Sequence, residues 1–351
     1  CGLGPTTEDL TKETAAQLMG KGLVMDMHSL ERVEAYFKAR RIEMTENNKK
    51  QALCPEGAMV LDNDNGTAPG LILEENGKRM ILLPGPPNEL HPLFEQQVKP
   101  YLQKLSPEIF YSRTVKLCGI GESKAAAMIQ DMIDAQTNPT IAPYAKTGEV
   151  HLRVTARAKD EQEGKKLVKP VIRELKKRFG EMVYTTKEER TLEEAVVKLL
   201  KKNKMSITCA ESCTGGLLAG RIVNVAGASS VFQTGYVTYA NQAKRRLLGV
   251  KKSTLREFGA VSTQTAKEMA SGALAAAKGD VAGSTTGIAG PDGGTARKPV
   301  GLVYIGCSVQ GHTIAQEYRF SGNREKIRDN AVSAALTLTR RCILENCSKK
   351  E

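Results

Sequence analysis

The chain has 351 residues, a formal net charge of +12 and 40% hydrophobic residues. This length predicts two or three domains, each able to bury its own core. No apolar run approaches the roughly 20 residues that a membrane span needs, and the first residues lack the pattern of a signal peptide. We therefore expect a cytoplasmic protein without membrane contact.

The cysteines and the net charge indicate the redox state of the thiols and the kind of binding partner. The 8 cysteines are spread without a CxxC pair, which predicts reduced thiols and no zinc site. The positive charge is consistent with an anionic partner, such as a nucleotide, a nucleic acid or a phosphorylated metabolite. Aromatic residues make up only 5% of the chain, with no tryptophan, which argues against nucleic acid as that partner.

The first part, expected at 1–106, is predicted to be an α/β domain with polar loops. It opens with CGLGPTTEDLTKE, a glycine-rich turn before a helix at 10–19. Such a turn presents N–H groups to phosphate or carboxylates to a metal, although a capped helix start explains it equally well. Two β-prone runs at 70–74 and 79–83 predict a hairpin.

The middle part, expected at 107–186, has an α+β pattern similar to that of a small KH-like domain. We expect a strand at 114–118, a helix at 122–133, a strand at 150–157 and a lysine-rich helix at 160–179. Its loop reads GIGE and not the GxxG that clamps a nucleic-acid backbone. We therefore expect this part to be a structural spacer.

The last part, expected at 187–351, is predicted to be an α/β domain with three polar, glycine-rich loops. Thr191 and Glu194 have capping-box spacing, and Ser262 is expected to cap a helix that runs to Lys278. Strands are expected at 206–210, up to about Tyr239, and at 281–285, 300–309 and 313–320. The loops after the first three strands should converge at one end of the sheet and form a site.

A candidate nucleophile lies in SITCAESCTGG, residues 206–216, at a turn from strand to helix. The first turn of a helix leaves N–H groups unpaired, which can stabilise an oxyanion or a phosphate, although small polar residues there are often plain caps. Ser212 and Cys213 are both candidates. A thiol at a helix N-terminus has a lowered pKa, so spacing alone leaves the choice open.

The candidate base is a lysine. None of the four histidines falls in the polar loops, so a Ser-His-Asp triad is not expected; they are His28, His91, His151 and His312. A lysine can serve when burial or a neighbouring cation lowers its pKa. Lys244, on a helix beside Tyr239 and Asn241, is the candidate, with a plain exposed lysine as the alternative.

The loop GIAGPDGG, residues 287–294, would let a ligand approach the backbone closely. Asp292 could contact a ribose or a metal there, and a plain turn is the alternative. Arg324 and Arg328 lie one turn apart on the terminal helix, where they could bind phosphate or pair within the helix.

Taken together, these motifs carry a family resemblance. AESCTGG, TYANQAK, GAVS, GIAGPDGG, KPVGLVYIG and GNRE occur in this order and closely resemble the C-terminal domain of the CinA family. In the first part, GLGPTTEDLT, NKKQALCPEGA, NGTAPG and LPGPPNEL resemble loops of the molybdopterin-binding, MogA/MoaB-like domain. The fold expected from the resemblance is α/β and multi-domain, with a partial MogA/MoaB-like domain, a KH-like domain and a CinA-type domain.

The resemblance implies hydrolysis of the carboxamide of nicotinamide mononucleotide to nicotinate mononucleotide and ammonia. It implies Ser212 as nucleophile and Lys244 as base, with Tyr239 and Asn241 positioning the base or the pyridine ring. Backbone N–H groups of Cys213, Thr214 and Gly215 would form the oxyanion hole. The other implied contacts are to ribose or phosphate, from Gly287, Gly290, Asp292 and Gly293, and to phosphate, from Arg324 or Arg328. No metal or cofactor is required.

For the first part, the resemblance implies ADP-ribose pyrophosphatase activity with a divalent metal. Cys1 stands where the family motif has a second glycine, and the strand and helix that normally precede this loop are absent. We therefore expect this activity to be weak or absent, and release of AMP from ADP-ribose would contradict us. A homodimer is expected by resemblance. Two alternatives remain open: a non-enzymatic nucleic-acid or protein adaptor in competence or DNA damage, and a pterin-binding protein.

Overall fold

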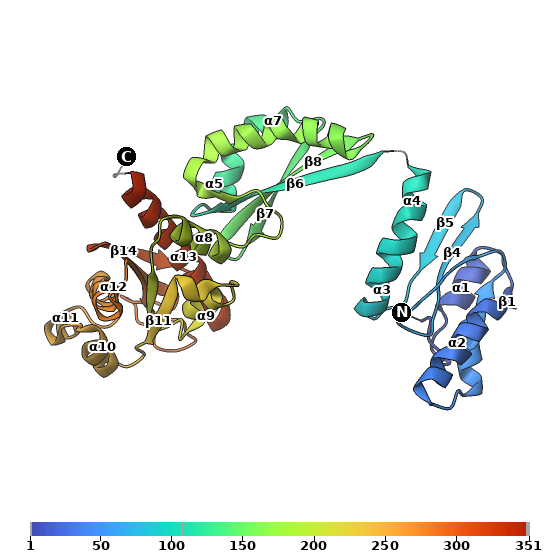
Figure 1. The fold of residues 1–351 in the computed structure, drawn as a ribbon, viewed down its shortest axis with the longest axis horizontal. Coiled ribbons are helices and arrows are strands. Elements are labelled where there is room, and N and C mark those ends of the chain that lie inside the picture. Colours follow the sequence, from blue (N-terminus) through green and yellow to red (C-terminus); the bar gives the residue numbers. More distant parts are fainter. Residues whose placement is uncertain (1, 107, 349–351) are drawn as a thin grey trace. The chain divides into compact units, whose positions relative to one another are not determined.

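The structure, a computed structural model, describes residues 2–106 and 108–348. The chain divides into two compact units, Cys1–Ile109 and Phe110–Glu351. The middle and last parts expected from the sequence lie together in the second unit (Figure 1). No helix in the described ranges is long and apolar enough to cross a membrane.

The first unit contains a three-stranded antiparallel sheet, in the order β3-β4-β5, and a two-stranded sheet of β1 and β2. The strands are β1 (Leu23–Met25), β2 (Leu53–Pro55), β3 (Met59–Leu61), β4 (Gly70–Glu75) and β5 (Lys78–Leu82). The helical segments are α1 (Thr11–Leu18), α2 (Met27–Arg40), η1 (Glu46–Ala52), α3 (Pro87–Leu93), η2 (Phe94–Val98) and α4 (Lys99–Leu105).

Two local predictions for this unit can be compared with the structure. The hairpin is confirmed as β4 and β5, with a tighter turn in which Asn76 and Gly77 adopt φ angles of 50° and 73°. In the glycine-rich turn, the Asp9 carboxylate accepts hydrogen bonds from the Thr6 N–H and hydroxyl at 2.9 and 2.6 Å. No side chain caps α1. Cys1, where the sequence departs from the family motif, lies outside the described residues.

The KH-like part has a four-stranded sheet in the order β7-β8-β6-β9, with α7 running along it (Figure 1). Its elements are β6 (Ile109–Cys118), α5 (Glu122–Ala127), α6 (Gln130–Asp134), β7 (Thr140–Lys146), β8 (Glu149–Ala158), α7 (Glu161–Phe179), η3 (Gly180–Met182) and β9 (Val183–Thr185). The prediction of one helix over 122–133 is wrong. Ile129 leaves the helical conformation with φ −126° and is fully buried, so core packing breaks the helix there.

The last part is built on a five-stranded sheet in the order β11-β10-β12-β13-β14. β10 pairs in parallel with β11 and β12, and β13 and β14 continue the sheet antiparallel. The strands are β10 (Ile207–Glu211), β11 (Phe232–Val237), β12 (Val281–Gly287), β13 (Leu302–Val309) and β14 (His312–Arg319). The carboxyl ends of β10, β11 and β12 therefore meet at one edge of the sheet, as the loop pattern predicts.

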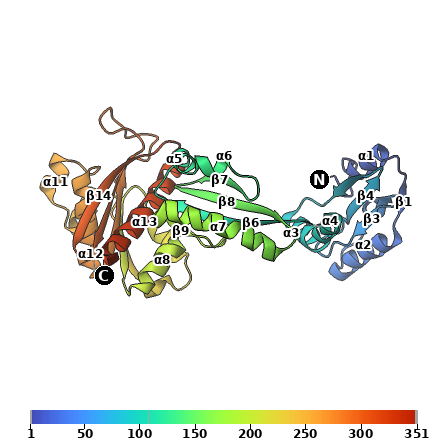
Figure 2. The same cartoon turned by 90° about the horizontal axis from the view of Figure 1, so that it is seen from above.

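Helices cover both faces of this sheet (Figures 1 and 2). They are α8 (Leu192–Lys202), α9 (Leu217–Val223), η4 (Ala228–Ser230), α10 (Asn241–Leu248), α11 (Lys252–Glu257), α12 (Thr263–Ala277) and α13 (Arg324–Ser348). The Thr191 capping box of α8 and the Ser262 cap of α12 are both confirmed.

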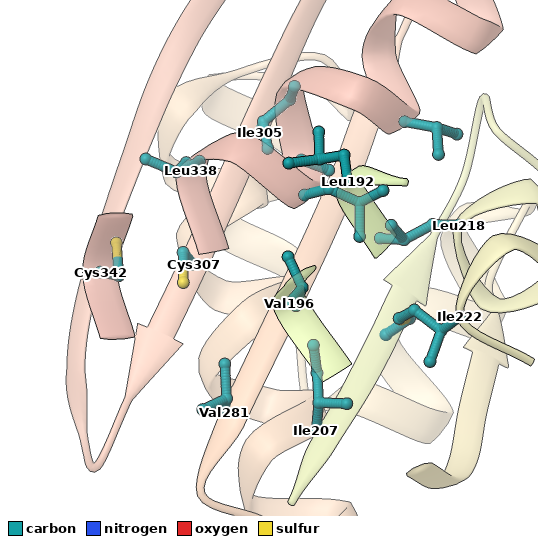
Figure 3. Packing of buried hydrophobic residues seen from close by; sticks show 14 of the residues in the cluster. Leu192, Val196, Ile207, Leu218, Ile222, Val281, Ile305, Cys307, Leu338 and Cys342 are labelled. Carbon is teal, nitrogen blue, oxygen red and sulfur yellow. The ribbon is translucent and has the colours of Figure 1, made fainter. Parts of the chain in front are cut away.

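Side chains alternate between the two faces along each strand. Ile207, Val281 and Ile305 pack against α8, α9 and α13 (Figure 3). Ala210 and Ala282 face α10 and α12 on the other side. This two-sided core fixes the sheet edge from which the polar loops extend.

Candidate active site

Ser212 and Lys244 lie in contact at the carboxyl edge of the parallel strands. Ser212 follows β10 directly, and its N–H donates to the carbonyl of Thr285 at 2.9 Å. Lys244 lies on α10, and its Nζ is 3.0 Å from the Ser212 Oγ. The same Nζ donates to the carbonyl oxygens of Thr238 and Tyr239, at 2.8 and 3.2 Å. These carbonyls aim the amine at the serine hydroxyl.

Burial brings the pKa of Lys244 into a range suited to proton transfer. Lys244 is only 1% exposed, and no carboxylate in the described part of the chain pairs with it. Burial lowers the pKa of Lys244 to about 8, because the charged form loses its hydration. Roughly a tenth of the amine is thus neutral at pH 7, and this neutral form can act as a general base.

Cys213, the alternative nucleophile, behaves differently from the prediction. Burial raises the pKa of the Cys213 thiol to about 12, so the thiol stays protonated. The expected lowering by a helix N-terminus is wrong, because α9 begins only at Leu217. The Leu217 N–H donates to the Thr214 carbonyl, and the next two N–H groups of the helix donate to a carboxylate.

That carboxylate belongs to Glu211, which we did not single out from the sequence. Glu211 is 1% exposed. Its Oε2 accepts from the Thr214 hydroxyl at 2.6 Å and from the N–H groups of Gly216 and Leu218 at 3.0 Å, and its Oε1 accepts from the Ala219 N–H at 2.8 Å. The sequence signal for Glu211 is its position: an acidic residue at the end of an apolar strand, directly before a glycine-containing turn that leads into a helix. Glu211 therefore fixes the turn that presents Ser212.

Arg328 holds the same turn from the side of α13. Its Nε and Nη2 donate to the carbonyls of Cys213 and Thr214 at 3.1 and 2.8 Å. In a trans peptide the N–H points opposite to the C=O, so the Thr214 N–H is directed away from Arg328. The N–H groups of Cys213 and Thr214 donate to no other residue in the described ranges.

A cavity of about 190 Å³ opens beside the serine and the lysine. Its lining residues are Ser212, Cys213, Tyr239, Lys244, Ala260, Val261, Thr286, Gly287, Ala289 and Arg324. The structure thus brings together most of the expected catalytic residues. Arg324 donates to the Gly290 carbonyl at 2.7 Å and lies 3.5 Å from the Tyr239 hydroxyl, so a cation stands at the wall.

Other expected site residues do not line this cavity. They are Thr214, Gly215, Asn241, Gly290, Asp292, Gly293 and Arg328. Asp292 is exposed, within a wholly exposed run over 291–297. Asn241 is also exposed, at the first turn of α10.

Four lining residues were not selected from the sequence: Ala260, Val261, Thr286 and Ala289. Ala260 and Val261 belong to the GAVS motif, which was the signal for them. The Thr286 hydroxyl donates to the Ala260 carbonyl at 2.7 Å, and Lys298 donates to the Val261 carbonyl at 2.7 Å. These bonds tie the wall to β12 and to the loop that follows it.

Two sequence expectations concern histidine and a divalent metal. No histidine lines the cavity. In the described ranges, no group of three or more His, Cys, Asp or Glu side chains is arranged to hold a metal ion. We derive no step through a divalent metal.

Comparison with known domains matches most of the chain, in three segments. Residues 1–104 match the family described as "Probable molybdopterin binding domain". Residues 112–185 match the "Damage-inducible protein CinA KH domain", and residues 189–343 match the "CinA C-terminal domain". The fold and these matches define a protein of three parts: a MogA/MoaB-like domain, a KH domain and a CinA C-terminal domain.

Relatives match over nearly the full length. A Clostridium beijerinckii protein named for competence and damage induction is 52% identical over 98% of this chain and 84% of its own. A CinA-like protein of Kosmotoga olearia is 51% identical over 98% of this chain and 83% of its own. The chain belongs to the CinA family.

A solved structure, the competence/damage inducible protein CihA of Agrobacterium tumefaciens, is 44% identical in sequence. It covers 42% of this chain and 90% of its own, with a TM-score of 0.41.

Proposed function

We propose that the Ser212–Lys244 pair hydrolyses the carboxamide of nicotinamide mononucleotide to nicotinate mononucleotide and ammonia. The observation that carries the proposal is the 3.0 Å contact between the serine hydroxyl and a buried lysine without a carboxylate partner. A serine is a weak nucleophile until a base takes its proton, and a lysine with a lowered pKa is such a base.

In the first half of the proposed reaction, neutral Lys244 takes the proton of Ser212 as Oγ attacks the amide carbon. The bond between Oγ and that carbon forms, and the carbonyl oxygen becomes an oxyanion. The N–H group of Cys213, a residue that lines the cavity, has no acceptor in another described residue and is the proposed donor to this oxyanion. Lys244 then gives the proton to the amide nitrogen, the C–N bond breaks and ammonia leaves.

In the second half, water attacks the ester on Ser212. Lys244 takes a proton from this water, and the second tetrahedral intermediate collapses with return of the proton to Oγ. The acid that is released loses the remaining proton of the water to solvent, which leaves a carboxylate and free Ser212, so both halves use the same base. All groups that act on the reacting atoms are side chains or backbone N–H groups of this chain.

The choice of nicotinamide mononucleotide rests on the motif resemblance, and the cavity is compatible with it. The cavity that contains Ser212 has Tyr239 and Arg324 at its wall. An aromatic ring and a guanidinium are suited to a cationic pyridine ring and to a phosphate, respectively. The ring with its amide would enter the cavity, and the phosphoribosyl group would extend past Arg324.

The test is turnover by the purified full chain. We expect nicotinate mononucleotide and ammonia to form in equal amounts from nicotinamide mononucleotide, and the rate to be unchanged by EDTA. Absence of turnover in a folded protein would overturn the proposal, and loss of turnover in EDTA restored by added metal would overturn the metal-independent mechanism.

A further inference from the structure

A second and larger cavity lies in the second unit, away from the active site. It has a volume of about 730 Å³ and shares no lining residue with the cavity around Ser212. The loop after β6 and the turn between β7 and β8 form one side, and β14 and α13 form the other. Small-molecule sites typically have volumes of roughly 300–1,000 Å³, so this cavity has the size of a ligand site.

Part of its wall is apolar and flat. Tyr318 lies in β14 and Phe320 directly follows it; their rings are nearly parallel, with centroids 5.6 Å apart and an interplanar angle of 13°. Ile120 and Met182 contribute apolar side chains from the KH-like part, and Leu338 contributes one from α13. These surfaces favour a flat, apolar group.

The charged groups of the lining favour an anion. Arg340 donates to the backbone carbonyls of Glu181 and Val183, the latter at 3.1 Å, and no carboxylate in the described ranges pairs with it. Its guanidinium is thus fixed in place without an ion-pair partner; it also interacts with the Cys118 thiol, and its five N–H donors exceed these three contacts. By contrast, the Glu149 carboxylate already accepts from Tyr184 and lies 3.2 Å from His151 Nε2.

The remaining charged side chains of the lining do not cancel this preference. Glu122, Glu181 and Lys146 are exposed, and Arg341 lies 3.5 Å from Glu345. The cation that is both held by the protein and free of a carboxylate is therefore Arg340. A guanidinium of this kind gains most from a bound carboxylate, sulfonate or phosphate.

We propose that this cavity is a second binding site, which takes a small organic anion with a flat aromatic ring. The ring would pack along Tyr318 and Phe320, and the anionic group would accept hydrogen bonds from Arg340. The site does not depend on the reaction proposed for Ser212.

The test measures binding of two fluorescent probes to the intact full chain. The two probes have the same aromatic rings. Anilinonaphthalenesulfonate carries an anion, and N-phenylnaphthylamine lacks it. Fluorescence titration and calorimetry should give one sulfonate probe per chain, bound more tightly than the neutral probe. In Arg340→Gln, affinity for the sulfonate should fall by about ten-fold or more, with little change for the neutral probe, because a hydrogen bond to a charged group contributes roughly 1.5–3 kcal/mol.

Two further variants complete the test. Thr337→Trp places a large ring in the lining and should abolish binding of both probes, whereas the exposed arginine variant Arg319→Gln should change neither. Near-UV circular dichroism checks that each variant is folded. If either Thr337→Trp or Arg340→Gln does not fold, the folded one of the two tests the site. Unchanged binding in folded Thr337→Trp would overturn the site. Equal loss of both probes in Arg340→Gln would overturn the preference for an anion.

Discussion

Lys244 sets the pH dependence of the proposed reaction. Only the neutral amine can take the proton from Ser212, and burial lowers the pKa of Lys244 to about 8. We expect kcat/KM to rise with pH through this range and to level off above it. The measurement is kcat/KM for nicotinamide mononucleotide between about pH 6 and pH 10, a span that brackets this pKa. A profile that is flat or falls over this range would show that Lys244 is not the base.

Glu211 is expected to act as a positioning residue. In Glu211→Gln, the amide oxygen can still accept from the three donors that now bond to Oε2, but without the negative charge, and its NH2 group would face the Ala219 N–H that now bonds to Oε1. Loss of these charge-assisted bonds should lower kcat by roughly ten-fold to a hundred-fold, with a smaller effect on KM. Steady-state kinetics on nicotinamide mononucleotide would check this.

The matched control for this change is Glu193→Gln. Glu193 lies on α8 and pairs with Arg221 at 2.5 Å, without contact to the turn. We expect its kcat to be near that of the parent. A folded Glu211→Gln enzyme with the parent kcat would show that the turn holds its shape without the carboxylate.

At the scale of elements, the position of α10 depends on close packing against α12. A Cβ added at Gly272 in α12 would lie 1.9 Å from the carbonyl oxygen of Leu248, the last residue of α10. Gly272→Ala should therefore push apart the two helices and destabilise the protein by about 1–3 kcal/mol or more. Because α10 carries Lys244, turnover should fall as well.

Gly220→Ala provides the comparison for that prediction. Gly220 lies inside α9, and no atom lies within 4 Å of an added Cβ. Alanine there should be neutral or stabilise by up to about 1 kcal/mol. Thermal and urea unfolding of the full chain would compare the two variants. Equal stability of both would contradict the packing seen between α10 and α12.

The sequence predicts elements better where local chemistry decides them. The caps at Thr191 and Ser262 and the hairpin at Asn76-Gly77 follow from residue types next to one another, and all three are present. The break at Ile129 depends on burial in a core made from distant segments, so local periodicity could not show it.

The same distinction holds for the site. The position of Ser212 in a loop at the sheet edge follows from strand and turn patterns. The contact with Lys244 spans 32 residues, and that between Arg328 and the Cys213 carbonyl spans 115, so only the folded chain brings them together. For this reason the sequence could not show that Arg328 binds the turn, or that Asp292 is exposed outside the cavity.

At the scale of the whole molecule, the net charge of +12 leaves nucleic acid as the main rival partner. The KH-like loop lines a cavity that faces α13, and its Gly119 is so close to Thr337 that an added Cβ would lie 3.1 Å from it. The loop also reads GIGE, with the acidic Glu122 in place of the GxxG pattern that clamps a nucleic-acid backbone. We expect no specific binding in fluorescence anisotropy with labelled single-stranded RNA or DNA at physiological salt.

The adaptor alternative makes the opposite prediction. Tight binding that weakens steeply between roughly 50 and 200 mM salt, together with no turnover of nicotinamide mononucleotide, would favour it.

The most direct measurement compares Ser212→Ala with Cys213→Ala in the full chain, with nicotinate mononucleotide and ammonia as readouts. Ser212 contacts the base Lys244, whereas burial keeps the pKa of the Cys213 thiol high, at about 12. Loss of an activated nucleophile should abolish turnover in Ser212→Ala, and Cys213→Ala should retain most of it. Turnover that survives in Ser212→Ala and disappears in Cys213→Ala would move the nucleophile by one residue and contradict the Ser212–Lys244 mechanism.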